Sequence, residues 1–266
     1  MKKLNPLPDW VTGLVIAGTF GGLLVSELLR PLRKSVEPKL RRDARNLTIA
    51  GIGALAVAVS EQPVARRLSA FAAERHWGLL RYTRLPLWLE TAAAVLLMDY
   101  TLYWWHVATH RVPLLWRFHA VHHADLDMDA STGLRFHVGE LVLSLPWRAS
   151  QIALIGVSPL ALSLWQTLLY VSILFHHSNL RLAPRAERWL NLLIVTPRMH
   201  GIHHSMKKTE SDTNWSSGLS IWDRLHGTIL LDVPQDRIRI GVASYPEPDD
   251  VTLPRTLVMP FLPQPD

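Results

Sequence analysis

The chain of 266 residues contains no cysteine. Disulfide bonds, thiolate zinc sites, iron–sulfur clusters and thiolate-ligated haem are therefore excluded, because each of them needs a cysteine sulfur. Any metal that this protein binds must be held by nitrogen and oxygen atoms.

Acidic residues are fewer than basic ones, 22 against 28, which leaves a net charge of +6. A basic excess suits either nucleic acid or a membrane surface. The basic residues here flank apolar runs instead of alternating with aromatic residues, so the sequence predicts anionic lipid head groups as partners and no nucleic acid. Hydrophobic residues make up 48% of the chain, and the mean hydropathy is +0.12. Both values indicate a membrane protein with a polar portion.

Three apolar stretches are predicted to cross the membrane as helices. Residues 10–29 carry Glu27 as their only charge and are long enough for a hydrocarbon core of about 30 Å. A cleaved signal peptide is the alternative for this stretch, but it lacks a clear small-x-small cleavage site. Residues 46–60 are shorter and rich in glycine and alanine, and residues 85–105 end in a belt of tyrosine and tryptophan.

Two basic connectors join these predicted spans. Residues 30–45 are crowded with lysine and arginine, which marks the cytoplasmic side and would place the N-terminus outside. Residues 61–85 form a second basic connector, which should lie on the opposite side and therefore conflicts with a simple positive-inside assignment.

The next two apolar runs are interrupted by proline. Residues 141–157 contain Pro146, and residues 159–175 begin with Pro159. Each run is short for a crossing, so the pair predicts a hairpin that enters the membrane and returns to the same face. Residues 178–266 are polar and are not predicted to span.

Histidine is abundant, with thirteen residues, and eight of them are grouped at helical spacing. The pattern H-x-x-x-H is followed by H-x-x-H-H, which occurs twice, and side chains three and four apart leave one face of a helix. Eight motif histidines exceed what one ion needs, so two metals are predicted, with a ninth histidine after the hairpin filling a vacancy. Imidazole suits iron, copper, zinc and nickel, so the ligands alone leave the metal open. The predicted ligands are His106, His110, His119, His122, His123, His177, His200, His203 and His204.

Further residues are candidates for supporting these ligands or for an extra ligand. Asp99 lies two helical turns before the first histidine pair, where it could accept a hydrogen bond from a ligand N–H or cap a polar network at the end of the span. His137 and Glu140 are three apart and could orient ligands or bond to the backbone. His76 and His226 have no partner at ligand spacing and are predicted to be ordinary histidines. The candidate supporting set is Asp99, His137, Glu140, His176, Asn214 and Asp223.

The order of these motifs resembles the fatty acid hydroxylase/sterol desaturase superfamily, whose members are integral-membrane, non-haem di-iron oxygenases. The resemblance covers about residues 99–228. It implies that the nine histidines bind two iron ions. It also implies that O2 and electrons from a ferredoxin, a cytochrome b5 or a reductase are used to oxidise C–H bonds of sterols, fatty acyl chains or similar lipids. The matching elements are H-V-A-T-H from His106, L-W-R-F-H-A-V-H-H ending at His123, H-S-N from His177, T-P-R-M-H-G-I-H-H ending at His204, and W-D-R-L-H-G-T from Trp222.

Two positions depart from the family pattern. Val138 follows His137 where the family usually has proline, and His226 stands where an aromatic residue is more common. Neither position belongs to the predicted ligand set. The departures bear on the geometry of the hairpin and on the lid near the site.

We predict an all-α, multi-span membrane protein with about three transmembrane helices, a membrane hairpin and a cytosolic helical cap that holds the metals. Residues 1–85 would form the N-terminal membrane helices and connectors, 86–232 the catalytic domain and 233–266 a proline-rich tail. The predicted function is hydroxylation or desaturation of a lipid by a di-iron oxygenase whose active site faces the cytoplasm. A membrane hydrolase with histidine-bound zinc stays an alternative, although no H-E-x-x-H motif is present, as does a non-enzymatic haem or metal-binding protein.

The lipid is expected to reach the metals from within the bilayer. Leaving the bilayer would cost roughly 0.8 kcal/mol for each methylene exposed to water. Entry between the third predicted span and the hairpin is therefore favoured, with Trp147 and Trp165 as candidate walls.

Overall fold

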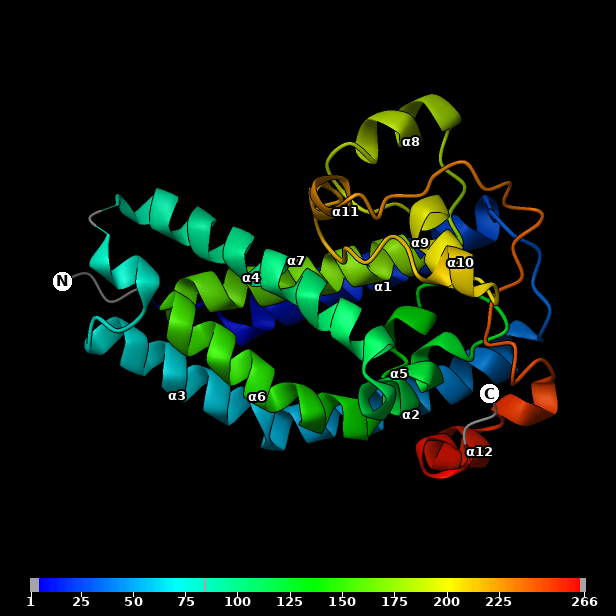
Figure 1. Cartoon of the computed structure of the whole chain (residues 1–266), viewed down its shortest axis with the longest axis horizontal. Helices are drawn as coiled ribbons and strands as arrows, with labels where there is room; N and C mark the ends of the chain where they lie inside the picture. Colours follow the sequence, from blue (N-terminus) through cyan, green and yellow to red (C-terminus); the bar gives the residue numbers. More distant parts are fainter. Residues whose placement is uncertain (1–4, 84, 264–266) are drawn as a thin grey trace.

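The computed structural model describes residues 5–83 and 85–263, and within these ranges every regular element is a helix (Figure 1). The prediction of an all-α fold is confirmed. Three isolated backbone bridges are the only extended pairings in the described part of the chain.

Six long helices run along the long axis of the molecule, and shorter helices gather around one end (Figure 1). The long helices are α1 (Asp9–Leu29), α2 (Lys39–Val59), α3 (Glu61–Glu74), α4 (Leu87–Arg111), α6 (Val138–Ile155) and α7 (Pro159–His177). The shorter α-helices are α5 (Pro113–His123), α8 (Pro184–Leu190), α9 (Pro197–His203), α10 (Lys208–Ser211), α11 (Ile221–His226) and α12 (Leu253–Val258). Four 3-10 turns complete the set: η1 (Leu79–Tyr82), η2 (Thr132–Leu134), η3 (Pro248–Val251) and η4 (Met259–Phe261).

The helices α6 and α7 form the centre of the bundle. α6 packs against α2, α3 and α4, whereas α7 packs against α1, α4 and α9. Met98, Ile152 and Trp165 are buried where α4, α6 and α7 meet. α7 therefore carries the bundle directly to the end at which the short helices gather.

The turn between α6 and α7 depends on glycine. Gly156 has φ +79, a left-handed conformation that side chains rarely adopt, and ends α6. It also meets Gly78, where an added Cβ would lie 2.3 Å from the Cα of Gly156. The two glycines let the α6–α7 turn contact the backbone between α3 and α4.

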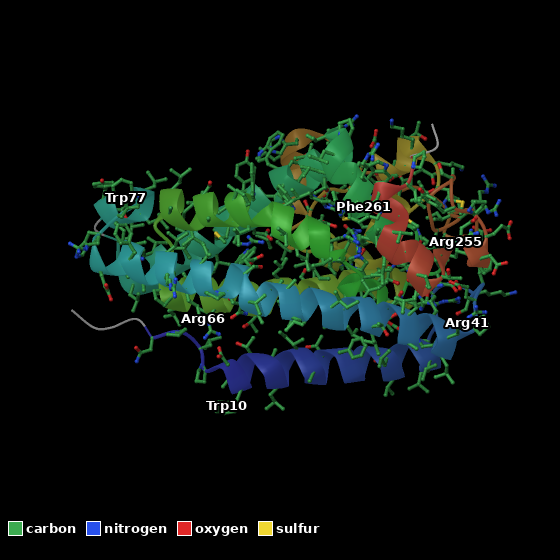
Figure 2. The ribbon with its side chains drawn as sticks, turned by 90° about the horizontal axis from the view of Figure 1, so that it is seen from below. Trp10, Arg41, Arg66, Trp77, Arg255 and Phe261 are labelled. Atoms are coloured by element: carbon green, nitrogen blue, oxygen red, sulfur yellow. The ribbon has the colours of Figure 1, made fainter. Side chains whose placement is uncertain are left out.

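Three helical stretches are long and apolar enough to cross a membrane: Asp9–Leu29, Lys39–Tyr82 and Pro159–His177. The first agrees with the predicted span at residues 10–29. Its surface is largely apolar and exposed, as expected for contact with lipid, with Trp10 at 71% and Leu28 at 68% exposure. Figure 2 shows this helix along one edge of the molecule, and it packs on α7.

The second predicted span was too short, and the prediction of a basic connector at residues 61–85 was wrong. Residues 61–74 continue as α3 after a bend at Ser60, and the candidate span reaches Tyr82. Pro63 is tolerated because it lies in the first turn of α3. Ala65 and Ala72 are buried, while the side chain of Arg66 is 60% exposed. An amphipathic helix thus stands where charge alone had indicated a loop.

The third predicted span, residues 85–105, forms most of α4, but α4 is not among the three candidate spans. Its acidic residues, among them Glu90 and Asp99, lower its hydropathy. The candidate spans do include α7, which was predicted to be half of a shallow hairpin. The helices α6 and α7 follow one another across a short turn and run in opposite directions (Figure 1), while a membrane hairpin at this place stays a prediction.

Candidate metal centre

The structure brings the nine predicted histidines together at the end of the bundle where α4, α5, α7 and α9 meet. In each of two groups, one ring nitrogen from every residue lies within 4.8 Å of the others. All nine side chains are buried except that of His110, which is half-buried. The first group is His106, His110, His119, His123 and His203, and the second is His122, His177, His200 and His204.

Each H-x-x-H-H motif contributes to both groups, which the sequence reading did not foresee. The prediction had placed the three histidines of a motif on one helical face. In the structure the neighbours His122 and His123 belong to different groups, and so do His203 and His204. Adjacent residues on a helix diverge by about 100°, so α5 and α9 each supply ligands on two sides.

Ring nitrogens in the first group face one another without a proton donor between them. Nδ1 of His106 lies 2.7 Å from the carbonyl oxygen of Trp215, and Nδ1 of His203 lies 2.8 Å from that of Thr213. A carbonyl only accepts, so in the neutral rings Nδ1 carries the proton and Nε2 presents a lone pair. These two Nε2 atoms are 3.1 Å apart. A shared cation would convert this repulsive contact into two metal–nitrogen bonds.

Burial keeps these rings neutral. It lowers the pKa of His203 to about 3. Burial and the neighbouring imidazoles likewise lower the pKa of His123 and His204 well below the usual value for histidine. A neutral imidazole is the form that binds a metal.

In the second group His177 is oriented in the same way. Nδ1 of His177 lies 2.8 Å from the carbonyl oxygen of Ile173, while its Nε2 is 3.0 Å from Nε2 of His122 and 3.1 Å from Nε2 of His200. Both ring nitrogens of His204 are buried without a hydrogen-bond partner among the described residues. Unsatisfied buried nitrogens at two adjacent points fit a pair of metal ions.

A carboxylate and a backbone loop fix the orientation of the first group. Glu140 Oε1 lies 2.8 Å from Nδ1 of His119, as the sequence suggested for a residue that orients a ligand. The loop that supplies the carbonyls of Thr213 and Trp215 is itself held by Asn214 and Asp223.

Asn214 and Asp223 therefore support the site through the backbone. Asn214 has φ +55 and donates from Nδ2 to the carbonyls of Met199 and Leu230. Asp223 accepts from the backbone N–H of Trp215 at 2.8 Å. Both residues belong to the predicted supporting set. Both contact the backbone of the loop that binds the imidazoles, and neither contacts an imidazole itself.

The other candidates of that set take different positions. Asp99 accepts from Trp222 Nε1 at 2.7 Å and from the Leu219 N–H at 3.0 Å. Within the described ranges it makes no hydrogen bond or ion pair to a histidine, so it takes the polar-network role and the ligand contact was wrong. His176 packs against His200, with ring centroids 4.1 Å apart, but belongs to neither group.

Three further histidines lie outside both groups. His137 is the N-cap of α6, where Nδ1 accepts from the Gly139 N–H, and its other nitrogen lies 3.1 Å from the carbonyl of Leu257. The prediction of His137 as an extra ligand was therefore wrong, because both nitrogens are used by the backbone. His226 stacks on Tyr103, and His76 is exposed; neither belongs to a group.

A network of aspartates and basic residues beside the histidines was missed by the sequence reading. Asp125 follows the second histidine motif and accepts from Arg42 at 2.9 Å and from Arg45 at 3.1 Å. Burial raises the pKa of Asp125, but the neighbouring guanidinium groups outweigh it and hold that pKa at about 2. The basic residues in this network, Lys39, Arg42 and Arg45, had been interpreted as charges of a cytoplasmic connector. The usable signal was the D-x-D-x-D pattern at 125–129 opposite basic residues spaced by three.

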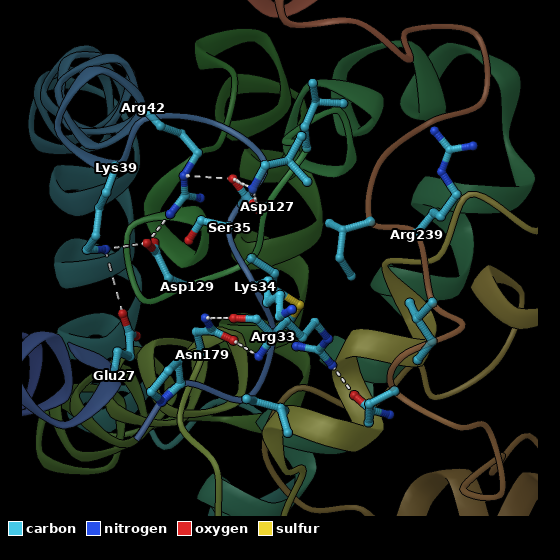
Figure 3. A pocket seen from close by; sticks show the side chains of 18 of the residues that line it. Glu27, Arg33, Lys34, Ser35, Lys39, Arg42, Asp127, Asp129, Asn179 and Arg239 are labelled. Carbon is cyan, nitrogen blue, oxygen red and sulfur yellow. Dashed lines mark hydrogen bonds and ion pairs between the residues drawn. The ribbon is translucent and has the colours of Figure 1, made fainter. Parts of the chain in front are cut away.

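This network borders a cavity of about 980 Å³. Figure 3 shows Lys39 and Arg42 of α2 pointing toward Asp129 and Asp127 of the loop after α5. Arg33 lies at the other side of this cavity and packs on α9. An added Cβ at Gly201, between the histidines of α9, would lie 1.7 Å from Arg33 Nη2, so a side chain there would displace the guanidinium.

A second cavity, of about 160 Å³, reaches the histidines from the side of the bundle. It extends to Val57 and Glu61 of the α2–α3 stretch, and Trp165 is one of its walls. Trp147 packs on Trp105, with ring centroids 5.8 Å apart. Six histidines line the cavity: His106, His119, His122, His176, His177 and His200.

The comparison with protein families finds one match, to the family described as fatty acid hydroxylase, over residues 91–228. The matched segment is slightly more than half of the chain and contains all nine histidines.

Several characterised proteins are similar to the same part of the chain. An ornithine lipid hydroxylase from Rhizobium tropici is 31% identical over 54% of this chain and 42% of its own length. Human alkylglycerol monooxygenase is 32% identical over 51% of this chain and 29% of its own length. A very-long-chain aldehyde decarbonylase from rice is 28% identical over 59% of this chain. The chain thus spans less than half the length of these first two relatives, and no solved structure gives a significant match.

Proposed function

The chain belongs to the fatty acid hydroxylase family, and from that premise we propose that it is a membrane-bound di-iron oxygenase that hydroxylates or desaturates a lipid. The observation that carries the proposal is the pair of adjacent histidine groups, whose buried nitrogens face one another and lack partners. Oxidation of an unactivated C–H bond needs a redox metal and O2, and the bound irons would supply that chemistry with electrons from a donor protein.

In this proposal the nine histidines divide between two ions. His106, His110, His119, His123 and His203 would hold one iron, and His122, His177, His200 and His204 the other. Glu140 and the backbone carbonyls bound to His106 and His203 keep the proton on Nδ1. Nε2 of His106, His119 and His203 is then free of a proton and available to an ion before any metal binds.

The smaller cavity is the proposed substrate site. It touches histidines of both groups and is walled by apolar side chains, among them Leu102, Leu141 and Ile173. Such a wall would hold an alkyl chain and exclude water from the metals. Because the cavity reaches Val57 on α2, entry from the bilayer beside α2 fits better than the predicted entry between α4 and the hairpin.

The names of the relatives agree with a lipid substrate. An ornithine lipid, an alkylglycerol and a very-long-chain aldehyde each join a long apolar chain to a polar group. We propose the same general class for this chain. The proposal that the histidine end faces the cytoplasm rests on basic residues at that end, among them Lys34 and Arg41.

Metal analysis of the purified, detergent-solubilised protein tests the proposal. We expect two irons per chain, no haem absorbance, and oxidation of added lipid in the presence of O2 and a reductant, detected by mass spectrometry. Two zinc ions with lipid hydrolysis would support the membrane hydrolase instead. Haem absorbance without turnover would support a carrier.

A further inference from the structure

The proposed chemistry leaves one polar feature of the smaller cavity unused. Glu61, at the start of α3, and Arg148, on α6, line it together as an ion pair, away from the histidines of either group. We propose that this pair binds the polar head of the lipid substrate, an uncharged or zwitterionic group with hydroxyl, ether or amide functions. Binding there would determine which carbon of the chain reaches the metals. This inference rests on the proposed function.

The pair is buried inside the helical bundle. The side chains of Arg148 and Glu61 are 11% and 12% exposed, and Arg148 Nε lies 3.4 Å from Glu61 Oε1. Glu61 also falls within the candidate span Lys39–Tyr82. Charged side chains at such positions are costly and usually mark a pathway or a binding site.

Arg148 has hydrogen-bond donors that are not used within the protein. A guanidinium has five N–H groups. Within the described ranges, Arg148 donates from Nη1 to Gln151 Oε1 at 2.7 Å, and its Nε faces Glu61 in the ion pair. Its Nη2 makes no hydrogen bond to another described residue. Its position is fixed by the indole of Trp165, which lies 4.2 Å from the guanidinium carbon.

Polar neighbours share this part of the cavity. Gln62, Gln166 and Tyr170 line it, and their side chains make no hydrogen bonds to the other described residues. The cavity thus offers unsatisfied donors and acceptors at this point and apolar walls elsewhere. A lipid head with several hydrogen-bonding atoms would satisfy them.

The charge balance selects the class of head group. The charges of Arg148 and Glu61 cancel, so a carboxylate or phosphate would add an uncompensated negative charge to an apolar cavity. An uncharged or zwitterionic head adds none. It can also accept from Arg148 and donate to Glu61 at the same time.

Helix geometry sets the distance between this pair and the metals. Glu140 contacts His119, and Arg148 lies eight residues further along α6, which is about 12 Å. On α7, Tyr170 lies seven residues before His177, which is about 10 Å. A head held at Arg148 would therefore present a carbon several methylenes down the chain, and not one next to the head group.

Binding and crosslinking of defined lipids test this inference without requiring turnover. We expect the purified wild-type protein to bind hexadecylglycerol more tightly than hexadecanoate, and also more tightly than hexadecane, which has no head group. In Arg148→Gln the preference over hexadecane should shrink about tenfold, since a hydrogen bond to a charged group is lost. Iron content should not change. Tyr170→Phe, which removes one hydroxyl, should reduce the preference by a smaller factor and serves if Arg148→Gln does not fold.

A second buried ion pair provides the matched control. Arg81 Nη1 lies 2.9 Å from Glu90 Oε1, with side chains 8% and 15% exposed, and neither residue lines the cavity. Arg81→Gln should lower the Tm and leave the lipid preference unchanged. If Arg148→Gln and Tyr170→Phe behave in the same way, the Glu61–Arg148 pair only joins helices and the inference is overturned.

Photo-crosslinking adds the orientation. A diazirine on the head of hexadecylglycerol should label peptides of α3 and α6, and one at the chain end should label helices further along the cavity. The reverse pattern would overturn the inference. Lipid oxidation by wild type with an unchanged preference in Arg148→Gln would sink the inference alone. Ordered binding without oxidation by the iron-loaded protein would sink the proposed function and leave the head-group site standing.

Discussion

Two buried polar clusters meet where α5 ends, and they differ in the source of their partners. In the aspartate–arginine network, the carboxylate of Asp125 accepts from Arg42, Arg45, Asn46 and Thr132, all from within the chain. In the histidine groups, backbone carbonyls accept from Nδ1 of several rings, and the inward-facing nitrogens meet only one another.

The polar groups of the aspartate–arginine network satisfy one another within the fold, whereas those of the histidine groups need a ligand. A buried carboxylate surrounded by guanidinium groups is compensated, and breaking it should affect folding first. A buried imidazole with an unpaired lone pair is uncompensated until a cation arrives. Variants in the two clusters should therefore fail in different ways.

The largest expected effect comes from removing one inward-facing imidazole. His203→Ala deletes a proposed ligand whose Nε2 lies 3.1 Å from that of His106. Loss of a ligand exceeds the cost of losing an outer partner, so activity should fall by more than about 100-fold and iron content should drop. Iron analysis and lipid turnover measure this. His76→Ala is the control, and a variant at His203 that kept both irons would refute the ligand assignment.

Breaking the compensated cluster should cost stability instead. Asp125→Asn leaves the buried Arg42, Arg45 and Arg135 with less opposing charge. We expect the folded state to lose about 3–5 kcal/mol, seen as a lower Tm in detergent. Asp9→Asn removes the same charge from an exposed pair with Arg66 and should change stability by less than about 1 kcal/mol. Equal losses in the two variants would contradict the distinction between the clusters.

The sequence was informative where chemistry is tied to local spacing. Eight of the nine histidines could be listed from their motifs, because i, i+3 and i+4 spacing on a helix brings side chains near one another. The division of each motif between two groups could not be predicted, because it depends on how α5 and α9 are rotated relative to the rest of the site. That rotation is fixed by long-range packing, such as Arg33 against Gly201.

Charge was the least reliable guide to the fold. Basic residues at 39–45 and 61–74 suggested loops, yet both segments are helical. Arg42 is compensated by aspartates about eighty residues away, and Arg66 points outward. Neither arrangement can be deduced from composition. Asp99 illustrates the same limit, since its partner Trp222 is distant in sequence.

Glu140 combines features of both clusters, because it is a buried carboxylate whose partner is an imidazole of the metal centre. Glu140→Leu removes the acceptor of His119 Nδ1, so the preferred tautomer is lost and iron affinity should fall about 10–100-fold. Glu140→Gln keeps an acceptor oxygen and should recover most of that affinity. Iron titration of the metal-free protein measures both. Unchanged affinity in the leucine variant would mean that His119 is held in other ways.

The smallest expected effect tests whether proximity in sequence to the site is enough to make a histidine a ligand. His137 accepts from the Gly139 N–H as the N-cap of α6 and is bound through its other nitrogen to the Leu257 carbonyl. Removing such a cap costs about 1 kcal/mol, so His137→Ala should lower the Tm modestly with iron content and turnover intact. His137→Asn restores a capping oxygen and should regain part of the loss. Release of iron from the alanine variant would show that the metal centre extends to α6, beyond the two groups of inward-facing nitrogens.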